Sequence, residues 1–281
     1  MSITVAIVAA GAMGSGVAQR LTENGVTVLT SLAGRSEASV KRAKAAGMRA
    51  VDDAQLMEAG LFLSIVPPGD ARRLAERFRP LLAAASRKPV FVDCNAVSPP
   101  TMRGNAEVIA ASGASFVAAG IIGPPPKPGS TNTKLYVSGP AAHEVMRLNE
   151  HGLIVRIVEG PLTAASALKM SYAGITKGFT ALAAGMMLAA TRDGSAEALK
   201  AELAESQPAM TQWLGRQIPA MYSKAYRWVA ELDEIGGFVG EEFPEHAMLT
   251  AAARFYQRIA EDYDGKKDEV DILDAFVKPK G

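Results

Sequence analysis

The amino-terminal end of the chain carries residues suited to binding a phosphate group. An apolar stretch over residues 3–8 is followed directly by Ala9-Ala10-Gly11-Ala12-Met13-Gly14. Where a buried strand turns into a helix, small residues let the backbone approach a diphosphate closely. The first N–H groups of the helix and the positive end of its dipole then attract the anion. We predict that Gly11, Ala12, Met13 and Gly14 bind the diphosphate of a dinucleotide, although a tight turn without a ligand can have the same composition.

The end of the second predicted strand, Val26–Thr30, indicates which dinucleotide is bound. An NAD site usually has a carboxylate there, which binds the ribose 2′-hydroxyl. The first acidic residue here is Glu37, which better fits the start of the next helix. Ser31, Arg35 and Ser36 offer the hydrogen-bond donors and the positive charge that a 2′-phosphate requires. We expect NADP (NADPH) to be preferred, with NAD possible; alternatively, Arg35 is a solvent-facing loop residue.

A lysine in an apolar helical stretch is the candidate for proton transfer. Lys169 lies among alanines, a leucine and a methionine. At about 100° per residue, Tyr172 and Ala173 share its face, and Lys177 lies near the edge of that face. Burial lowers the pKa of a lysine, so Lys169 can give or take a proton near neutral pH, with Tyr172 or Lys177 assisting or replacing it. The alternative is a lysine whose stem covers apolar surface while its ammonium reaches water.

Composition narrows the class of protein. Of 281 residues, 48% are hydrophobic, which is enough for a packed core, and the net charge of +1 gives no basic surplus for nucleic acid. The single cysteine, Cys94, excludes an intramolecular disulfide and favours a reducing, cytoplasmic compartment. The longest apolar stretch, residues 178–190, is too short to span a bilayer, so we expect no membrane contact. The histidines are scattered and predict no metal site: His143, His151 and His246.

The pattern of elements predicts an α/β fold, a Rossmann-like doubly wound parallel sheet followed by an all-α domain. We expect an NAD(P)-binding domain over residues 1–160 and an all-helical substrate and dimerisation domain over residues 161–281. Further strands are expected at 61–66, 90–92, 116–119, 135–137 and 154–158, and the later helices at 166–190, 196–203, 208–222 and 245–263.

Ligands of such sheets bind beyond the carboxyl ends of the strands. Three further strand ends are therefore candidates, although each could be ordinary turn chemistry. They are Val66-Pro67-Pro68 and Asn95-Ala96 for the cofactor, and Ile122-Gly123 for the substrate.

Taken together, these motifs resemble the β-hydroxyacid dehydrogenases and 6-phosphogluconate dehydrogenases over nearly the whole chain. Gly11-Ala12-Met13-Gly14 matches the family's cofactor turn, and Val66-Pro67-Pro68 and Asn95–Pro99 match its strand-end loops near the nicotinamide. Lys169 falls where the family has its catalytic lysine. The run from Lys224 to Ile235 is similar to a less-characterised branch with a distinctive carboxyl-terminal domain. The resemblance also implies a homodimer formed through the helical domain.

Two departures from the family pattern concern the substrate. In acid-specific members a D-A-P-V-S-G-G segment helps to hold the substrate carboxylate, and the aligned residues here are 118–124. The family's serine has become Ile122, before Gly123, and its asparagine one turn after the lysine has become Ala173. Two polar contacts to a carboxylate are missing, so the pocket is expected to be more apolar, and a plain small β-hydroxyacid is a doubtful substrate.

Three functions follow. The first is an NADP-dependent oxidoreductase that transfers a hydride between the nicotinamide and a small alcohol or carbonyl compound. The second is an imine reductase-like enzyme that reduces C=N bonds with NADPH, which an apolar pocket would suit. The third is a non-catalytic NADPH-binding protein, a hypothesis that the two missing polar contacts motivate.

Overall fold

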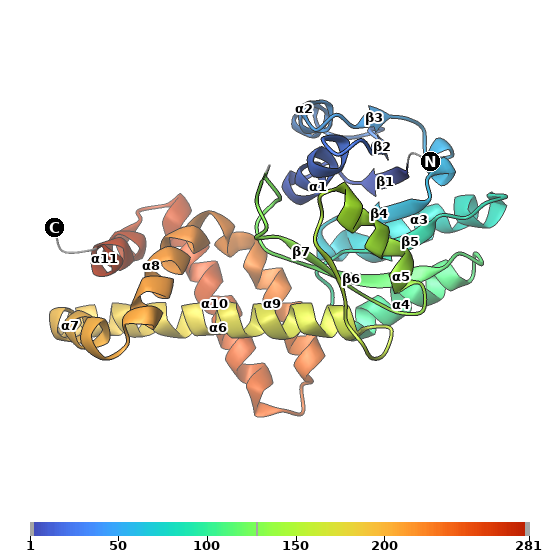
Figure 1. Ribbon diagram of the computed structural model, residues 1–281. Helices are drawn as coiled ribbons and strands as arrows, with labels where there is room; N and C mark the ends of the chain where they lie inside the picture. The colour runs from blue at the N-terminus through green and yellow to red at the C-terminus, as the bar shows by residue number, and fades with distance from the viewer. Residues whose placement is uncertain (1–2, 128, 279–281) are drawn as a thin grey trace. The chain divides into compact units, whose positions relative to one another are not determined.

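The computed structural model describes residues 3–127 and 129–278, and the chain forms two compact units (Figure 1). We call residues 1–170 the nucleotide unit and residues 171–281 the helical unit. The strands all belong to the nucleotide unit among the residues that the structure describes. This division agrees with the predicted fold class, an α/β sheet followed by helices.

One sheet of eight strands runs through the nucleotide unit in the order β3-β2-β1-β4-β5-β6-β7-β8. The first six strands in this order are parallel, whereas β7 pairs antiparallel with β6 and parallel with β8. The order 3-2-1-4-5-6 is that of a doubly wound dinucleotide-binding sheet. The strands are β1 (Thr4–Val8), β2 (Thr27–Thr30), β3 (Arg49–Ala50), β4 (Leu61–Ser64), β5 (Val90–Asp93), β6 (Phe116–Ile122), β7 (Lys134–Ser138) and β8 (Val155–Ile157).

Helices cover both faces of the sheet because successive residues of its inner strands are apolar and point to opposite faces. In β1, Val5 and Ile7 belong to the core on one face, and Ala6 and Val8 to the core on the other. Helices α1, α2 and α5 pack on the first face, and α3 and α4 pack on the second. Their bounds are α1 (Ala12–Thr22), α2 (Glu37–Ala45), α3 (Ala71–Ala84), α4 (Pro99–Ala110) and α5 (Ala142–Val145), with short 3₁₀ turns at Gln55–Glu58, Pro68–Asp70 and Met146–His151.

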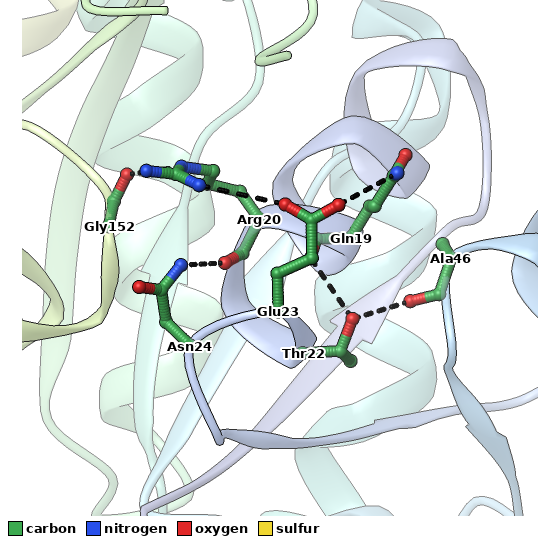
Figure 2. A network of polar contacts seen from close by, with 7 residues as sticks. All are labelled: Gln19, Arg20, Thr22, Glu23, Asn24, Ala46 and Gly152. Carbon is green, nitrogen blue, oxygen red and sulfur yellow. Dashed lines mark hydrogen bonds and ion pairs between the residues drawn. The ribbon is translucent and has the colours of Figure 1, made fainter. Parts of the chain in front are cut away.

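Polar contacts hold the carboxyl-terminal end of α1 in place (Figure 2). Arg20 Nε donates to the carbonyl oxygen of Gly152 at 3.1 Å, and Thr22 Oγ1 donates to that of Ala46 at 2.9 Å. The segment before β8 and the end of α2 are thus both fastened to this end of α1. The opposite end of the helix is thereby held at the carboxyl edge of the sheet, where the phosphate-binding turn is predicted.

The helical unit contains two helices that the sequence analysis did not anticipate, α9 and α11. Helix α11 begins at Asp268, within a charged stretch. The carboxylates of its first turn, Asp268, Glu269 and Asp271, stabilise the helix by interacting with the positive end of its dipole. The helices after residue 190 are α7 (Ala196–Ser206), α8 (Pro208–Met221), α9 (Ala225–Val239), α10 (Pro244–Asp264) and α11 (Asp268–Val277).

Helix α6 (Ala164–Arg192) runs from one unit into the other. We expected the domain boundary near residue 160, after the last strand. The chain instead divides into its two compact units after Met170. The first turns of α6 belong to the nucleotide unit because they pack against its strands. By length and composition, α6 is the one helix of the described residues that could cross a membrane, a test that the core helix of a soluble protein also passes.

Candidate functional site

The first turn of α1 has the properties of an anion site. Gly11 is the N-cap residue, no side chain caps the helix, and no acidic residue lies in its first turn. The N–H groups of Ala12, Met13 and Gly14 therefore have no partner within the helix and point out of its end. A β-carbon placed on Gly11 would meet no atom within 4 Å, so the space outside the turn is open. The residues of the predicted cofactor turn thus fit a diphosphate.

Gly14 explains how the helix comes so close to the strand before it. A β-carbon at this position would collide with the carbonyl oxygen of Ala9 and lie 3.7 Å from Ile7 Cγ2. Any larger residue would push α1 away from β1 and move the free N–H groups out of place.

The predicted 2′-phosphate residues lie in the loop between β2 and α2. Ser31 is buried, Arg35 is half-buried, and Ser36 is the N-cap residue of α2, whose side chain accepts from the N–H of Ser39 at 3.4 Å. Glu37 opens α2, as the sequence indicated, so no carboxylate lies between β2 and the helix.

Arg42 is a residue of this site that the sequence analysis missed. Its Nε donates to the carbonyl oxygen of Ala10 at 3.0 Å, and its Nη2 donates to Ser39 Oγ at 3.0 Å. A cation therefore joins the cofactor turn to the first turns of α2. The spacing of Ser39 and Arg42, three residues apart on one helix face, was the only available signal, and many surface helices have it.

A buried polar network connects the ends of β4 and β5. Asn95 Oδ1 accepts from the N–H of Val66 at 2.7 Å, while its Nδ2 donates to Ser64 Oγ at 2.8 Å and to Asp93 Oδ1 at 2.6 Å. The side chain of Asn95 is therefore directed into the protein. It shapes the loops at Val66-Pro67-Pro68 and Asn95-Ala96, and these loops would contact a cofactor through backbone and apolar atoms.

Asp93 is the ionisable centre of this network. Burial raises the pKa of the Asp93 carboxyl above its ordinary value, and hydrogen bonds from Asn95 and Asn105 lower that pKa in part. Asn105 Nδ2 donates to Asp93 Oδ2 at 2.9 Å, whereas the buried Asn105 Oδ1 has no hydrogen-bond partner in the structure.

The surroundings of Cys94 disfavour the thiolate form that a nucleophile requires. Burial raises the pKa of the Cys94 thiol, and the neighbouring Asp93 charge raises that pKa further. The residue lies beside a small apolar hollow whose lining includes Ile65, Ile121 and Pro126. A neutral thiol in such surroundings packs as an apolar side chain.

Lys169 lies half-buried where α6 passes close to β6. A β-carbon on Gly120 would be 2.8 Å from Lys169 Cβ and 2.9 Å from the carbonyl oxygen of Ala165, so only glycine permits this approach. Ser138 Oγ of β7 accepts from the N–H of Ala165 at 2.9 Å and donates to the carbonyl oxygen of Leu162 at 2.6 Å. The helix that carries the candidate lysine is thus seated against two strands.

The other two catalytic candidates lie further along α6, in the helical unit. Tyr172 is exposed, whereas Lys177 is buried and forms an ion pair with Glu231. Its ammonium lies 5.4 Å from the centre of the Trp228 ring, and the Tyr256 hydroxyl donates to its backbone carbonyl at 2.7 Å. These partners hold Lys177 inside the helical unit, and its part in proton transfer stays a prediction.

The substrate candidates occupy different settings. Ile122 is half-buried at the end of β6, Gly123 is exposed just beyond it, and Ala173 is buried within the helical unit. Among the residues described, no group of three histidine, cysteine, aspartate or glutamate side chains could hold a metal ion.

The two units differ in charge. Residues 1–170 contain 18 lysines and arginines against 12 aspartates and glutamates, whereas residues 171–281 contain 12 against 17. A nearly neutral chain therefore has a basic nucleotide unit, which favours the approach of an anionic dinucleotide.

Comparisons with known families give the class of protein. The family described as the NAD binding domain of 6-phosphogluconate dehydrogenase matches residues 4–148, which is more than half of the chain. A domain of unknown function (DUF1932) matches residues 190–259. The chain therefore belongs to the family of the NAD binding domain of 6-phosphogluconate dehydrogenase. No curated protein matches it.

Solved structures share the fold over nearly the whole chain. A protein of unknown function, described as similar to 3-hydroxyacid dehydrogenases, is 26% identical, with a TM-score of 0.75 over 96% of this chain and 99% of the other. The Mycobacterium tuberculosis 3-hydroxyisobutyrate dehydrogenase with L-serine is 16% identical, with a TM-score of 0.69 over 99% and 98%. The Myxococcus stipitatus imine reductase with NADP⁺ is 19% identical, with a TM-score of 0.55 over 98% and 100%. A variant of that reductase is bound to NAD⁺, so the shared fold leaves the choice of cofactor open.

The buried carboxyl of Asp93 predicts a pH-dependent stability. Because its folded pKa is raised, the folded state holds the proton more tightly than the unfolded state. The associated stability is present at low pH and is lost as the pH rises through the folded pKa. We expect Asp93→Asn, which cannot ionise, to gain stability relative to the wild type between pH 4 and pH 7. After rotation of its amide, Asn105 can offer its unpartnered Oδ1 to the new NH₂ group.

Urea unfolding at the two pH values measures this difference. The exposed Asp193 is the control position, where Asp193→Asn should give the same difference from the wild type at both pH values. A difference for Asp93→Asn that does not change with pH would contradict the assignment.

Proposed function

We propose that this protein is an NADP-dependent oxidoreductase that transfers a hydride between the nicotinamide and a small, largely apolar carbonyl or alcohol compound. The observation that carries the proposal is the uncapped, acid-free first turn of α1, open to solvent at Gly11, in a chain of the NAD-binding family. The fold shared with 3-hydroxyisobutyrate dehydrogenase and imine reductases supports this class of reaction.

The bound nicotinamide supplies the hydride chemistry at its C4 atom. The chain's own contribution is orientation and proton handling. In the oxidation direction, the neutral amine of Lys169 takes the hydroxyl proton as the carbon-bound hydrogen leaves with its electron pair. In reduction, the Lys169 ammonium gives a proton to the oxygen that becomes the hydroxyl.

The substrate is proposed to lack a tightly held carboxylate. Ile122 offers no hydrogen bond from its side chain, and the family position that it occupies is polar in acid-specific members. An apolar ketone or a cyclic imine fits this residue better than a small hydroxyacid, and the imine is the second candidate.

Lys169 is the residue that tests the reaction. We expect Lys169→Ala to lower kcat at least about 100-fold, because general acid–base groups contribute at least that factor. The dissociation constant for NADPH should stay within about threefold, because the cofactor turn is unchanged. The assay follows NADPH absorbance with 4-phenyl-2-butanone and 1-pyrroline, and NADP⁺ reduction with 3-hydroxyisobutyrate.

The exposed Lys266 provides a matched control, and Lys266→Ala should retain wild-type turnover. Full turnover by Lys169→Ala would remove the assignment. Turnover of 1-pyrroline alone would make the enzyme an imine reductase, and NADPH binding without turnover of any compound would favour a non-catalytic binding protein.

Preference for NADP is proposed to depend on Arg35 and Arg42. Arg42 places positive charge between the cofactor turn and the N-cap of α2. Ser31 and Ser36 of the loop and Ser39 in the first turn of α2 add hydroxyl donors. Hydrogen bonds between a guanidinium and a phosphate are among the stronger ones in proteins.

We expect NADPH to bind at least about tenfold more tightly than NADH, because a charge-assisted hydrogen bond is worth about 1.5–3 kcal/mol. Arg42→Ala and Arg35→Ala should each reduce that ratio, and Arg49→Ala, an exposed change on β3, should not. Calorimetry with both dinucleotides measures the ratio. Equal affinities in the wild-type protein would contradict the preference, and no binding of either would overturn the proposed function.

The protein is further proposed to form a homodimer through α6. One side of this helix, facing away from its buried side, exposes apolar residues at spacings of three and four, which we call the α6 seam. These residues are Tyr172, Ile175, Phe179, Leu182 and Met186. Such a seam packs well against an identical one, and a second copy of the chain supplies it in a two-fold interface. Met187, Leu188 and Tyr222 are buried inside the helical unit and do not belong to the seam.

We expect light scattering to give the mass of a dimer for the wild type and of a monomer for the double variant Ile175→Asp/Leu182→Asp. Met248→Asp, a change at an exposed apolar residue of α10, should leave the dimer intact. A monomeric wild type would contradict the proposed dimer. So would a wild type that sediments with phosphatidylcholine vesicles by way of its seam residues.

A further inference from the structure

One buried hydrogen bond joins the helix of Lys169 to the loop after β5. Ser166 Oγ donates to the backbone carbonyl oxygen of Val97, across 69 positions of sequence. Ser166 is 1% exposed and Val97 is fully buried. Water therefore cannot replace either partner without a change in the packing around them.

Other hydroxyl groups on α6 behave differently. Thr176 and Thr191 each donate to a carbonyl oxygen four residues earlier in the same helix. This local bond is the usual solution for a hydroxyl within a helix, and it links the helix to nothing else. Ser166 instead contacts a different segment, so its bond has a consequence for tertiary structure.

The segment that Ser166 contacts continues the polar network of the strand ends. Val97 follows Asn95 by two residues, and the N–H of Val97 donates to the Asn95 carbonyl oxygen at 3.0 Å. Asn95 in turn holds the N–H of Val66 at the end of β4. A chain of hydrogen bonds thus runs from β4 through the loop after β5 to the first turns of α6.

We propose that Ser166 is a positioning residue, which fixes the height and rotation of Lys169 relative to the Asn95–Val97 loop, one of the strand-end loops that would hold a bound nicotinamide. This inference rests on the proposed function. Lys169 follows Ser166 by three residues, about 4.5 Å along the helix axis. A shift of the helix against the loop moves the amine by a similar amount, and proton transfer depends steeply on such distances.

Two other contacts of the helix are made with strands. Gly120 and Ser138 seat α6 against β6 and β7. Loss of the Ser166 hydroxyl leaves the buried carbonyl of Val97 without its donor. The loop then has to move to recover a partner, while the helix remains on the sheet.

Three variants of Ser166 separate the effect of losing the hydroxyl from the effect of changing the side-chain volume. Ser166→Ala removes the donor, Ser166→Cys keeps a similar size with a weak donor, and Ser166→Thr restores the hydroxyl. Thr191→Ala is the matched control, because it removes a hydroxyl of the same helix that donates only to Met187.

The first readout needs no turnover. Hydrogen exchange followed by mass spectrometry should show at least tenfold faster exchange in residues 94–98 for Ser166→Ala and Ser166→Cys. Ser166→Thr and Thr191→Ala should exchange at the wild-type rate in that segment. The dissociation constant for NADPH should stay within about threefold in all four, because the first turn of α1 is unchanged. If Ser166→Ala does not fold, Ser166→Cys against Ser166→Thr makes the same comparison.

The second readout is the chemical step, with 4-phenyl-2-butanone and NADPH deuterated at the transferred position. We expect kcat for Ser166→Ala and Ser166→Cys to fall at least tenfold per folded molecule, with a larger primary isotope effect, and Ser166→Thr to recover most of the rate. A purely structural role would lower the folded fraction and leave both values unchanged per folded molecule. That result, or wild-type exchange in residues 94–98, would overturn the inference.

Failure of the proposed function is distinguishable from failure of this inference. Without NADPH binding or turnover in the wild type, the function fails, whatever the exchange data show. With wild-type turnover present and Ser166→Ala equal to it, the function stands and the positioning role of Ser166 is lost.

Discussion

The close approach of helix backbone to the sheet is the constraint on which the rest of this structure depends. At Gly14 and at Gly120, a single β-carbon would collide with atoms of the neighbouring element. The first contact places the free N–H groups of α1 at the edge of the sheet, and the second places Lys169 against β6. The two helix ends that carry the candidate chemistry are therefore positioned by the absence of side chains, and close packing of the interior leaves little freedom to shift them.

Polar groups buried at the strand ends then fix the loops between these helices. Ser64, Asp93, Asn95 and Asn105 form a network that is removed from water, and Asn95 within it holds the backbone of Val66. Each buried donor or acceptor left without a partner would cost about 1–3 kcal/mol, so the network favours one arrangement of the loops over alternatives. Asp93 adds a cost of its own, because its charge lies in a site that disfavours ionisation. The candidate site therefore contains one group, Asp93, whose ionisation opposes folding.

Helix α6 combines two faces with different tasks. On one face, Lys177 and its neighbours are buried, and the ion pair with Glu231 beneath Trp228 satisfies the charge inside the helical unit. On the other, the α6 seam remains apolar and exposed. Helix α6 is therefore long and apolar enough to cross a membrane because one face belongs to the core of the helical unit and the other is the exposed apolar seam.

Local patterns in the sequence were sufficient for most strands and helices, the turn from β1 into α1, the loop after β2, and the helix that carries Lys169. Each of these depends on residues close together in the chain, where periodicity and turn chemistry act directly. Helix α9 was missed because no regular apolar pattern was recognised in it, and α11 because its first turn reads as a charged surface segment. Only the tertiary structure decided that Arg42 contacts the cofactor turn, that Asn95 points inward, that Lys177 pairs with Glu231 and that Ser166 binds Val97. These contacts join residues that are separated by up to 69 positions, or depend on which way a side chain turns once its neighbours are packed. No short-range sequence pattern encodes these partners. Each buried polar group bonds to the partner that the folded chain places beside it, because a buried group without a partner is costly.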